Sequence, residues 1–131
     1  NSHKLKKNLD SRKIPGCVFR IHNFIPTFHK FHGKYCNGIQ IHITDSAIYR
    51  PVGTALEIFD AIIDTSPGEL MFNPPPYEYE TRLMPFDILS GDSLMRETLL
   101  KRQPVRIEKE RWMDEIEEFR KEFARISAYK E

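Results

Sequence analysis

The sequence has no run of apolar residues approaching the roughly 20 that a membrane-spanning helix needs, so we expect no membrane span in this chain. The basic start, NSHKLKKNLD, has no apolar stretch behind it, so we expect no signal peptide in this stretch. An initiator methionine is also missing, and we expect the chain to be part of a longer polypeptide. The 131 residues fit one domain, and we predict that residues 1–131 form it.

Cysteine is scarce. Cys17 and Cys36 are the two cysteines, and they do not form a CxxC pair. They could be joined in an oxidising compartment, or they could be two separate buried thiols. The sequence leaves both interpretations open.

Acidic residues are few in the first half of the chain. Residues 1–50 hold nine Lys/Arg and two Asp/Glu, whereas residues 51–131 hold eleven and seventeen. A basic half can attract an anionic polymer. Two halves of opposite sign in one small domain more often attract each other, so we expect no nucleic-acid partner.

The clearest periodic pattern lies in Gly38 to Asp45, GIQIHITD. It alternates isoleucine with polar residues, which predicts a strand with one face in the core. The core face holds Ile39, Ile41 and Ile43, and the polar face holds Gln40, His42 and Thr44. Such a strand is typical of antiparallel or mixed sheets.

The rest of the chain alternates helical and irregular segments. We predict five helices: His3–Lys13, Pro51–Asp64, Pro85–Leu89, Asp92 (as N-cap) to Arg102, and Ile107–Ala128. We also predict a strand at Cys17–Ile25, followed by a loop at Pro26–Asn37. The proline-rich segment Ser66–Arg82 is predicted to be irregular, with short strands at Glu69–Phe72 and Tyr77–Glu80. The last helix repeats apolar residues in a 4-3-4-3 rhythm that predicts one packed stripe: Trp112, Ile116, Phe119, Phe123 and Ile126. The predicted fold class is α+β, a small antiparallel or mixed sheet packed with helices and followed by a long C-terminal amphipathic helix.

Three of the five histidines and one cysteine gather in FHKFHGKYCNGIQIHITD, Phe28 to Asp45. A structural zinc site needs four soft ligands, usually in two close pairs, and here His29, His32 and Cys36 lack a second pair. Cys36 as a nucleophile would need a feature that lowers its pKa, and nothing local supplies one. We therefore predict no metal and no cofactor, and no catalytic cysteine.

Paired carboxylates are the remaining catalytic possibility, because glycosidases use two of them. The candidates are Asp45, Asp87, Asp92, Glu78 and Glu80. Asp45 ends a strand and Asp92 resembles a helix cap, while Glu78 and Glu80 lie in an exposed-looking segment. None has the apolar surroundings that make a carboxylic acid a proton donor at neutral pH, so we assign no catalytic residue in this chain.

The polar strand face is the better candidate site. If Cys17–Ile25 is the neighbouring strand, Arg20 and His22 lie alongside Gln40 and His42. The loop adds cations and aromatic rings: Phe28, Lys30, Lys34 and Tyr35. Such a mixture suits an anionic sugar or another carboxylate ligand. A polar face that meets only water or another domain is an equally good interpretation of the pattern alone.

A resemblance to a known family rests on FIPTFHKFHGKYCNGIQIHITD. The run, followed by Tyr49 and Pro51, resembles the C-terminal part of the bacterial exo-β-N-acetylmuramidase (NamZ) family. The matching positions are Pro26, Thr27, Phe28, Lys30, Gly33, Cys36, Gly38, Gln40, Ile41, His42, Thr44 and Asp45, with Ile14-Pro15-Gly16 upstream and Phe86-Asp87, Leu89, Gly91, Trp112, Phe119 and Tyr129 downstream. His29, His32 and Cys17 do not belong to the shared pattern, and we assign them no role.

The resemblance implies a glycosidase that releases N-acetylmuramic acid from the non-reducing end of peptidoglycan fragments, in cell-wall recycling. It also implies a periplasmic or secreted bacterial protein, with a preceding Rossmann-like domain that holds the catalytic carboxylate. This chain would then supply substrate contacts from Phe28, Lys30, Gln40 and His42, with a cation such as Lys30 or a protonated His42 selecting the lactyl carboxylate of the sugar. The alternative is a non-catalytic accessory domain that binds peptidoglycan or stabilises its neighbour.

Overall fold

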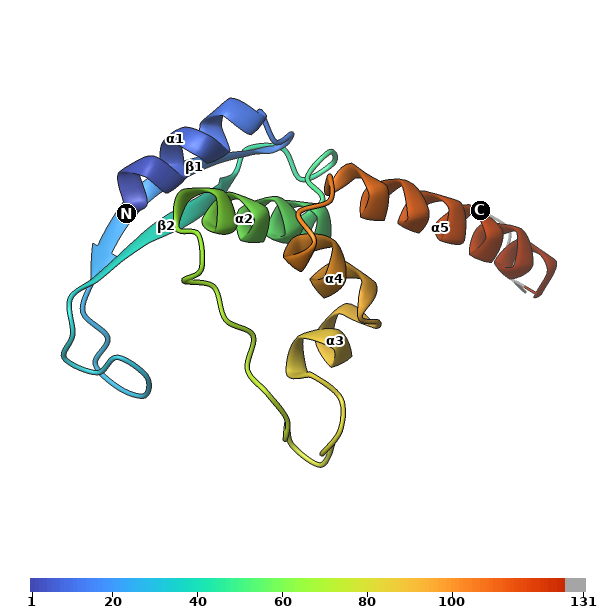
Figure 1. Ribbon diagram of the computed structural model, residues 1–131. Coiled ribbons are helices and arrows are strands. Elements are labelled where there is room, and N and C mark those ends of the chain that lie inside the picture. Colours follow the sequence, from blue (N-terminus) through green and yellow to red (C-terminus); the bar gives the residue numbers. More distant parts are fainter. Residues whose placement is uncertain (127–131) are drawn as a thin grey trace. The chain divides into compact units, whose positions relative to one another are not determined.

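The computed structural model describes residues 1–126 (Figure 1). Backbone contacts divide the chain into two compact units, Asn1–Met71 and Phe72–Glu131, the second of which is described as far as Ile126. The first unit contains α1 (Ser2–Arg12), β1 (Cys17–Phe24), β2 (Cys36–Ile43) and α2 (Pro51–Thr65), and the second contains α3 (Pro85–Ser90), α4 (Leu94–Leu100) and α5 (Arg106–Ile126). The α+β prediction is confirmed, and the elements begin and end within a few residues of their predicted bounds.

The sheet is a two-stranded antiparallel hairpin. Its register runs from Cys17 opposite Ile43 to Phe24 opposite Cys36. Residues opposite each other point to the same face, so one face carries alternate residues of both strands and packs under the helices. The core of the unit consists of Leu9, Cys17, Phe19 and Ala61, with Leu5, Ile14, Ile39, Tyr49 and Ile58 packed around them.

The prediction that all three isoleucines of β2 lie in the core is wrong for two of them. Ile39 packs on the core, but Ile41 and Ile43 are 40% and 56% exposed. Their partners on β1, Phe19 and Cys17, are buried. The difference arises because α1 lies over β1 (Figure 1), so β2 is covered on this face only in part.

Local chemistry explains where the first helices begin and end. Asn1 caps α1 by accepting hydrogen bonds from the backbone N–H groups of His3 and Lys4, and Lys13 ends it in a left-handed conformation. Pro51 occupies the first turn of α2, where its missing N–H needs no partner. The two helices are joined by one arginine. Arg12 lies 2.7, 2.7 and 2.6 Å from carboxylate oxygens of Glu57, Asp60 and Asp64.

Gly16 makes the tightest backbone contact described for any glycine. Its φ is +75°, and a Cβ atom there would lie 2.6 Å from the carbonyl oxygen of Asp45 and 2.8 Å from the nitrogen of Tyr49. Its own carbonyl accepts hydrogen bonds from Thr44 and Asp45. The start of β1 is therefore fixed directly against the end of β2.

The proline-rich segment, which begins in the first unit and continues into the second, is irregular, as predicted. The predicted strands at Glu69–Phe72 and Tyr77–Glu80 are wrong, since the only pairing described there is an isolated bridge between Tyr77 and Glu80. The Phe72 ring packs edge-on against Phe86 of α3, with centroids 4.7 Å apart.

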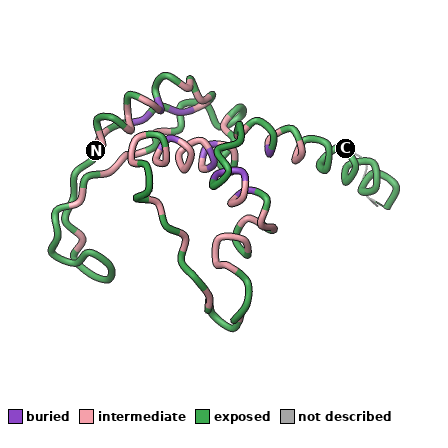
Figure 2. The backbone as a smooth tube through the Cα atoms, viewed as in Figure 1, coloured by how far each residue is buried: buried purple, intermediate pink, exposed green. Residues whose placement is uncertain are grey.

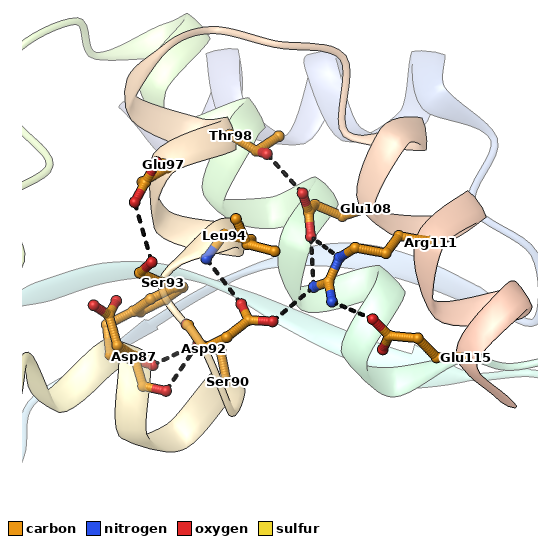
Figure 3. A network of polar contacts seen from close by, with 11 residues as sticks. Asp87, Ser90, Asp92, Ser93, Leu94, Glu97, Thr98, Glu108, Arg111 and Glu115 are labelled. Carbon is orange, nitrogen blue, oxygen red and sulfur yellow. Dashed lines mark hydrogen bonds and ion pairs between the residues drawn. The ribbon is translucent and has the colours of Figure 1, made fainter. Parts of the chain in front are cut away.

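A polar network joins the three helices of this unit (Figure 3). Glu108 is 3% exposed and accepts hydrogen bonds from Thr98 and Arg111, while Arg111 also pairs with Asp92 and Glu115. Ser93, and not Asp92, is the N-cap residue of α4, but an Asp92 oxygen accepts the Leu94 N–H at 2.8 Å. The prediction that Asp92 is the N-cap is therefore wrong by one position, although its side chain accepts a hydrogen bond from the first residue of the helix.

The predicted packing of the α5 stripe is wrong. Its members Ile116, Phe119, Phe123 and Ile126 are 43–73% exposed, and Glu108 is the one buried residue of α5 (Figure 2). The reason is length, because α4 has seven residues and contacts only part of a 21-residue helix. Ala128, the predicted end of the helix, and Tyr129 lie outside the described residues.

Both cysteines are free thiols. They occupy opposite ends of the hairpin, seven residues apart in register, or roughly 23 Å along the strands. A disulfide needs Cα atoms within about 7 Å, so the two residues do not pair. Burial raises the pKa of the Cys17 thiol.

We expect the two thiols to react at very different rates. A charged aromatic disulfide reagent should modify the half-buried Cys36 quickly and the buried, less acidic Cys17 slowly, because the thiolate is the reactive species. The fast phase should survive in Cys17→Ser and vanish in Cys36→Ser. Equal rates for both thiols in the folded chain would contradict this placement.

Candidate functional site

The second face of the hairpin is the candidate site. Val18, Arg20 and His22 of β1 lie opposite His42, Gln40 and Gly38 of β2. The neighbouring-strand expectation is therefore confirmed. Arg20 Nη2 donates a hydrogen bond of 2.6 Å to Gln40 Oε1, so these side chains meet across the strands.

His42 holds an unused polar atom on the same face. Among the described residues, His42 Nε2 and Thr54 Oγ1 are the buried side-chain polar atoms that have no hydrogen-bond partner. Such atoms normally find partners, because an unpaired buried group carries a desolvation cost of about 1–3 kcal/mol. The structure thus gives this nitrogen no polar partner, and because the atom is buried a ligand would reach it only if the side chain moved.

The loop between the strands, residues 25–35, carries the other predicted residues. Phe28 is 71% exposed and packs edge-on against the His29 ring, and Lys30 is exposed. Backbone hydrogen bonds from Gly33 to Pro26 and from Lys34 to Phe31 close the loop on itself. Its aromatic and cationic side chains are therefore displayed on an organised turn.

The predicted site residues fall into two groups. Gln40 lies beside Arg20, and His42 lies two residues farther along the same face. Phe28 and Lys30 belong to the loop, which continues beyond the strand ends at Phe24 and Cys36 (Figure 1). His42 is six residues from that end, roughly 20 Å along the strand, so one small group does not touch both Lys30 and His42.

The hairpin has no acidic residue. Neither Asp nor Glu occurs between Asp10 and Asp45. Within the described chain no ion pair involves Arg20, Lys30 or Lys34, whereas Arg12, Arg96 and Arg111 all have carboxylate partners. The charges on this element are therefore available to an anionic ligand.

The carboxylates weighed as catalytic acids mostly have structural partners. Asp45 accepts the Ala47 N–H, Asp87 pairs with Arg96 at 2.7 Å, and Asp92 pairs with Arg111. Hydrogen bonds from the backbone N–H groups of Arg82 and Leu83 lower the pKa of Glu80, the opposite of what a proton donor at neutral pH needs. These contacts favour the prediction that the catalytic residues lie outside this chain, and it stays a prediction.

No group of three His, Cys, Asp or Glu side chains among the described residues is placed to hold a metal ion. His29, His32 and Cys36 therefore do not form such a group. Over the same residues, no helix is both long enough and apolar enough to cross a membrane.

The contact between Arg20 and Gln40 is a feature of the site that the sequence pattern does not show. Pattern alone put Arg20 on a neighbouring strand, but its contact with Gln40 depends on the register, which the 25–35 loop sets. The signal available in the sequence was the alternation of Arg20 with Phe19 and Ile21 next to a second strand of matching period.

Comparisons with known proteins show which family the chain resembles. The family model described as "Exo-beta-N-acetylmuramidase NamZ, C-terminal" matches residues 1–129. The peptidoglycan beta-N-acetylmuramidase NamZ of Bacillus subtilis (strain 168) is 37% identical over 71 residues, which cover 54% of this chain and 17% of that protein. The crystal structure of a DUF1343 family protein from Bacteroides fragilis NCTC 9343 superimposes with a TM-score of 0.81 at 23% identity, covering 99% of this chain and 33% of that one.

The structural match and the family model support different conclusions. The structural match supports the fold, and the chain spans about one-sixth of the curated relative and one-third of the solved chain. The family model covers nearly every residue, including the hairpin and its loop. The chain therefore belongs to the family of C-terminal domains of exo-β-N-acetylmuramidase NamZ.

Proposed function

We propose that this domain supplies substrate contacts to a glycosidase that releases N-acetylmuramic acid from the non-reducing ends of peptidoglycan fragments. The observation that carries the proposal is a hairpin without acidic residues in a chain of this family. Arg20 on its polar face and Lys30 and Lys34 in its loop have no carboxylate partner among the described residues. N-acetylmuramic acid bears a carboxylate, and cations without carboxylate partners suit it.

The two groups of site residues would bind different parts of the glycan. Gln40 and His42 would hold the terminal sugar through hydrogen bonds. Phe28 and Lys30, farther along the hairpin, would contact the neighbouring part of the glycan, where an exposed ring can pack on a sugar face.

The catalytic carboxylate would belong to a preceding Rossmann-like domain, and the protein would act in the bacterial periplasm or outside the cell. The absence of acidic residues from the hairpin and the structural pairing of Asp45, Asp87 and Asp92 support placing catalysis elsewhere. On this proposal the isolated 131 residues fold but turn over no substrate.

In the full-length protein, Lys30→Ala and His42→Gln should each lower kcat/KM for a peptidoglycan oligosaccharide that ends in N-acetylmuramic acid by about tenfold, the effect of losing one charge-assisted or buried hydrogen bond. Release of N-acetylmuramic acid gives the rate, and thermal unfolding checks that each variant folds. Lys101→Ala, at an exposed lysine of α4's end, is the matched control and should leave the rate unchanged. Wild-type rates in both site variants would instead favour an accessory domain.

A further inference from the structure

The feature that goes beyond the proposed function is the arginine on the hairpin face. Arg20 is exposed, and its one described polar contact is the 2.6 Å hydrogen bond that Nη2 donates to Gln40 Oε1. A guanidinium has five N–H donors, so one contact leaves a complete edge of two parallel donors unused. This is the geometry that binds a carboxylate with two hydrogen bonds.

Gln40 orients the guanidinium without neutralising it. Its oxygen accepts from Arg20, and as an amide it adds no charge. The amide NH₂ of the same side chain remains a donor. Arg20 and Gln40 together therefore present a positive charge and several N–H groups from two rigid strands.

The other cations are less suited to this task. Lys30 lies in the loop beyond the strand ends, and a lysine is a point charge that does not fix the plane of a carboxylate. Arg12, Arg96 and Arg111 already have carboxylate partners. Among the described residues, Arg20 thus combines a free charge, a planar edge and a fixed position.

We propose that Arg20 binds the lactyl carboxylate of the muramic-acid ligand, with Gln40 as the positioning residue that orients its guanidinium. The assignment rests on the proposed function, since it names which residue of that site reads the acidic group. It moves this role from Lys30 and His42 to the centre of the strands. His42 Nε2 is buried and takes no part in this contact.

The test uses two substrates for the full-length protein: a chromogenic N-acetylmuramic acid glycoside and its lactyl methyl ester. The ester has nearly the same shape but no charge. Arg20→Gln should lower kcat/KM for the acid by about 10- to 100-fold and leave the rate for the ester unchanged. Arg106→Gln, the same substitution at a 75% exposed arginine of α5, should change neither rate.

Gln40→Glu tests the positioning role. A carboxylate at this position would pair with Arg20 internally, so the acid substrate should lose its advantage over the ester while thermal unfolding stays near the wild-type temperature. Acid and ester rates that fall by the same factor would show that Gln40 acts through the fold or through its own contact with the sugar, and not by orienting Arg20. Should Arg20→Gln fail to fold, Arg20→Lys keeps the charge and should lose part of the preference for the acid.

The outcomes separate the two proposals. If the wild-type protein turns over neither substrate, the proposed function fails and the assignment of Arg20 fails with it. If the wild-type protein is active and Arg20→Gln keeps the same ratio of acid to ester rates, or loses both rates equally, the carboxylate assignment is overturned and the proposed function stands.

Discussion

Replacing Gly16 with alanine is expected to lower the free energy of unfolding of the first unit by about 2–5 kcal/mol. Two costs combine. The backbone has φ +75°, which an L-residue with a Cβ atom adopts with strain, and that Cβ atom would lie 2.6–2.9 Å from backbone atoms of Asp45 and Tyr49. Backbone atoms do not move aside as the end of a flexible side chain does. Urea unfolding followed by circular dichroism measures the loss.

Gly68→Ala separates these two costs. Gly68 has φ +79°, but nothing lies within 4 Å of the position of its Cβ atom. It should therefore show the conformational cost alone, about 1–2 kcal/mol. Equal losses for Gly16→Ala and Gly68→Ala would show that the turn from Asp45 to Tyr49 gives way, and that β1 is not held as tightly as the distances indicate.

Arg12→Met is expected to cost about 2–4 kcal/mol at neutral pH, because it removes the cation that three partly buried carboxylates share. Arg12 is 16% exposed, and Glu57 and Asp60 are 15% and 17% exposed. Burial disfavours the charged guanidinium, but the hydrogen bonds and charges of Glu57 and Asp60 outweigh it and raise the pKa of Arg12. Methionine keeps the apolar stem of the side chain, so the loss of unfolding free energy measures the effect of removing the charge. Thermal and urea unfolding measure it.

The pH dependence of this loss has a definite sign. The raised pKa of Arg12 means that its contribution is fully present at every pH below the ordinary arginine range, so the cation itself does not titrate in the experiment. The stability that Arg12→Met loses should therefore not fade as the pH rises from neutral to mildly alkaline values, and urea unfolding at several pH values in that range measures it.

Lys101→Met is the control for Arg12→Met. Lys101 is 61% exposed and pairs with Glu97 one helical turn away, an arrangement worth about 0.5 kcal/mol or less. A loss at Arg12 no larger than at Lys101 would mean that the link between α1 and α2 adds nothing to stability. The packing of Leu9 and Ala61 would then hold the helices by itself.

Periodicity predicted the elements well because local physics decides them. The alternation of Gly38–Asp45 marked β2, Pro51 marked the start of α2, and the Pro15–Gly16 stop marked the end of α1. The sequence pattern did not predict which residues pair across the two strands, because the register depends on how the 25–35 loop closes. The contact between Arg20 and Gln40 follows from that register alone.

The wrong predictions of burial in β2 and α5 have one cause. Apolar spacing shows which face of an element is suited to burial, but not whether anything covers it. The pattern identified the correct face of β2, yet Ile41 and Ile43 are exposed because α1 lies over the other strand. The stripe of α5 has the spacing of a packed helix, yet Phe119 and Phe123 are 68% and 54% exposed. Coverage is a property of the tertiary arrangement, which a single-helix pattern does not contain.

A two-stranded sheet has one further consequence, which concerns solubility. In the described part of the chain neither β1 nor β2 has a strand on its outer side, so each leaves a row of backbone N–H and C=O groups without a ladder partner. β2, with the sequence CNGIQIHI, is rich in β-branched residues and has no permanent charge, the composition of segments that stack into fibrils. Partial opening of the first unit would therefore expose a template for intermolecular pairing, and concentrated solutions of the isolated chain are expected to aggregate through this strand.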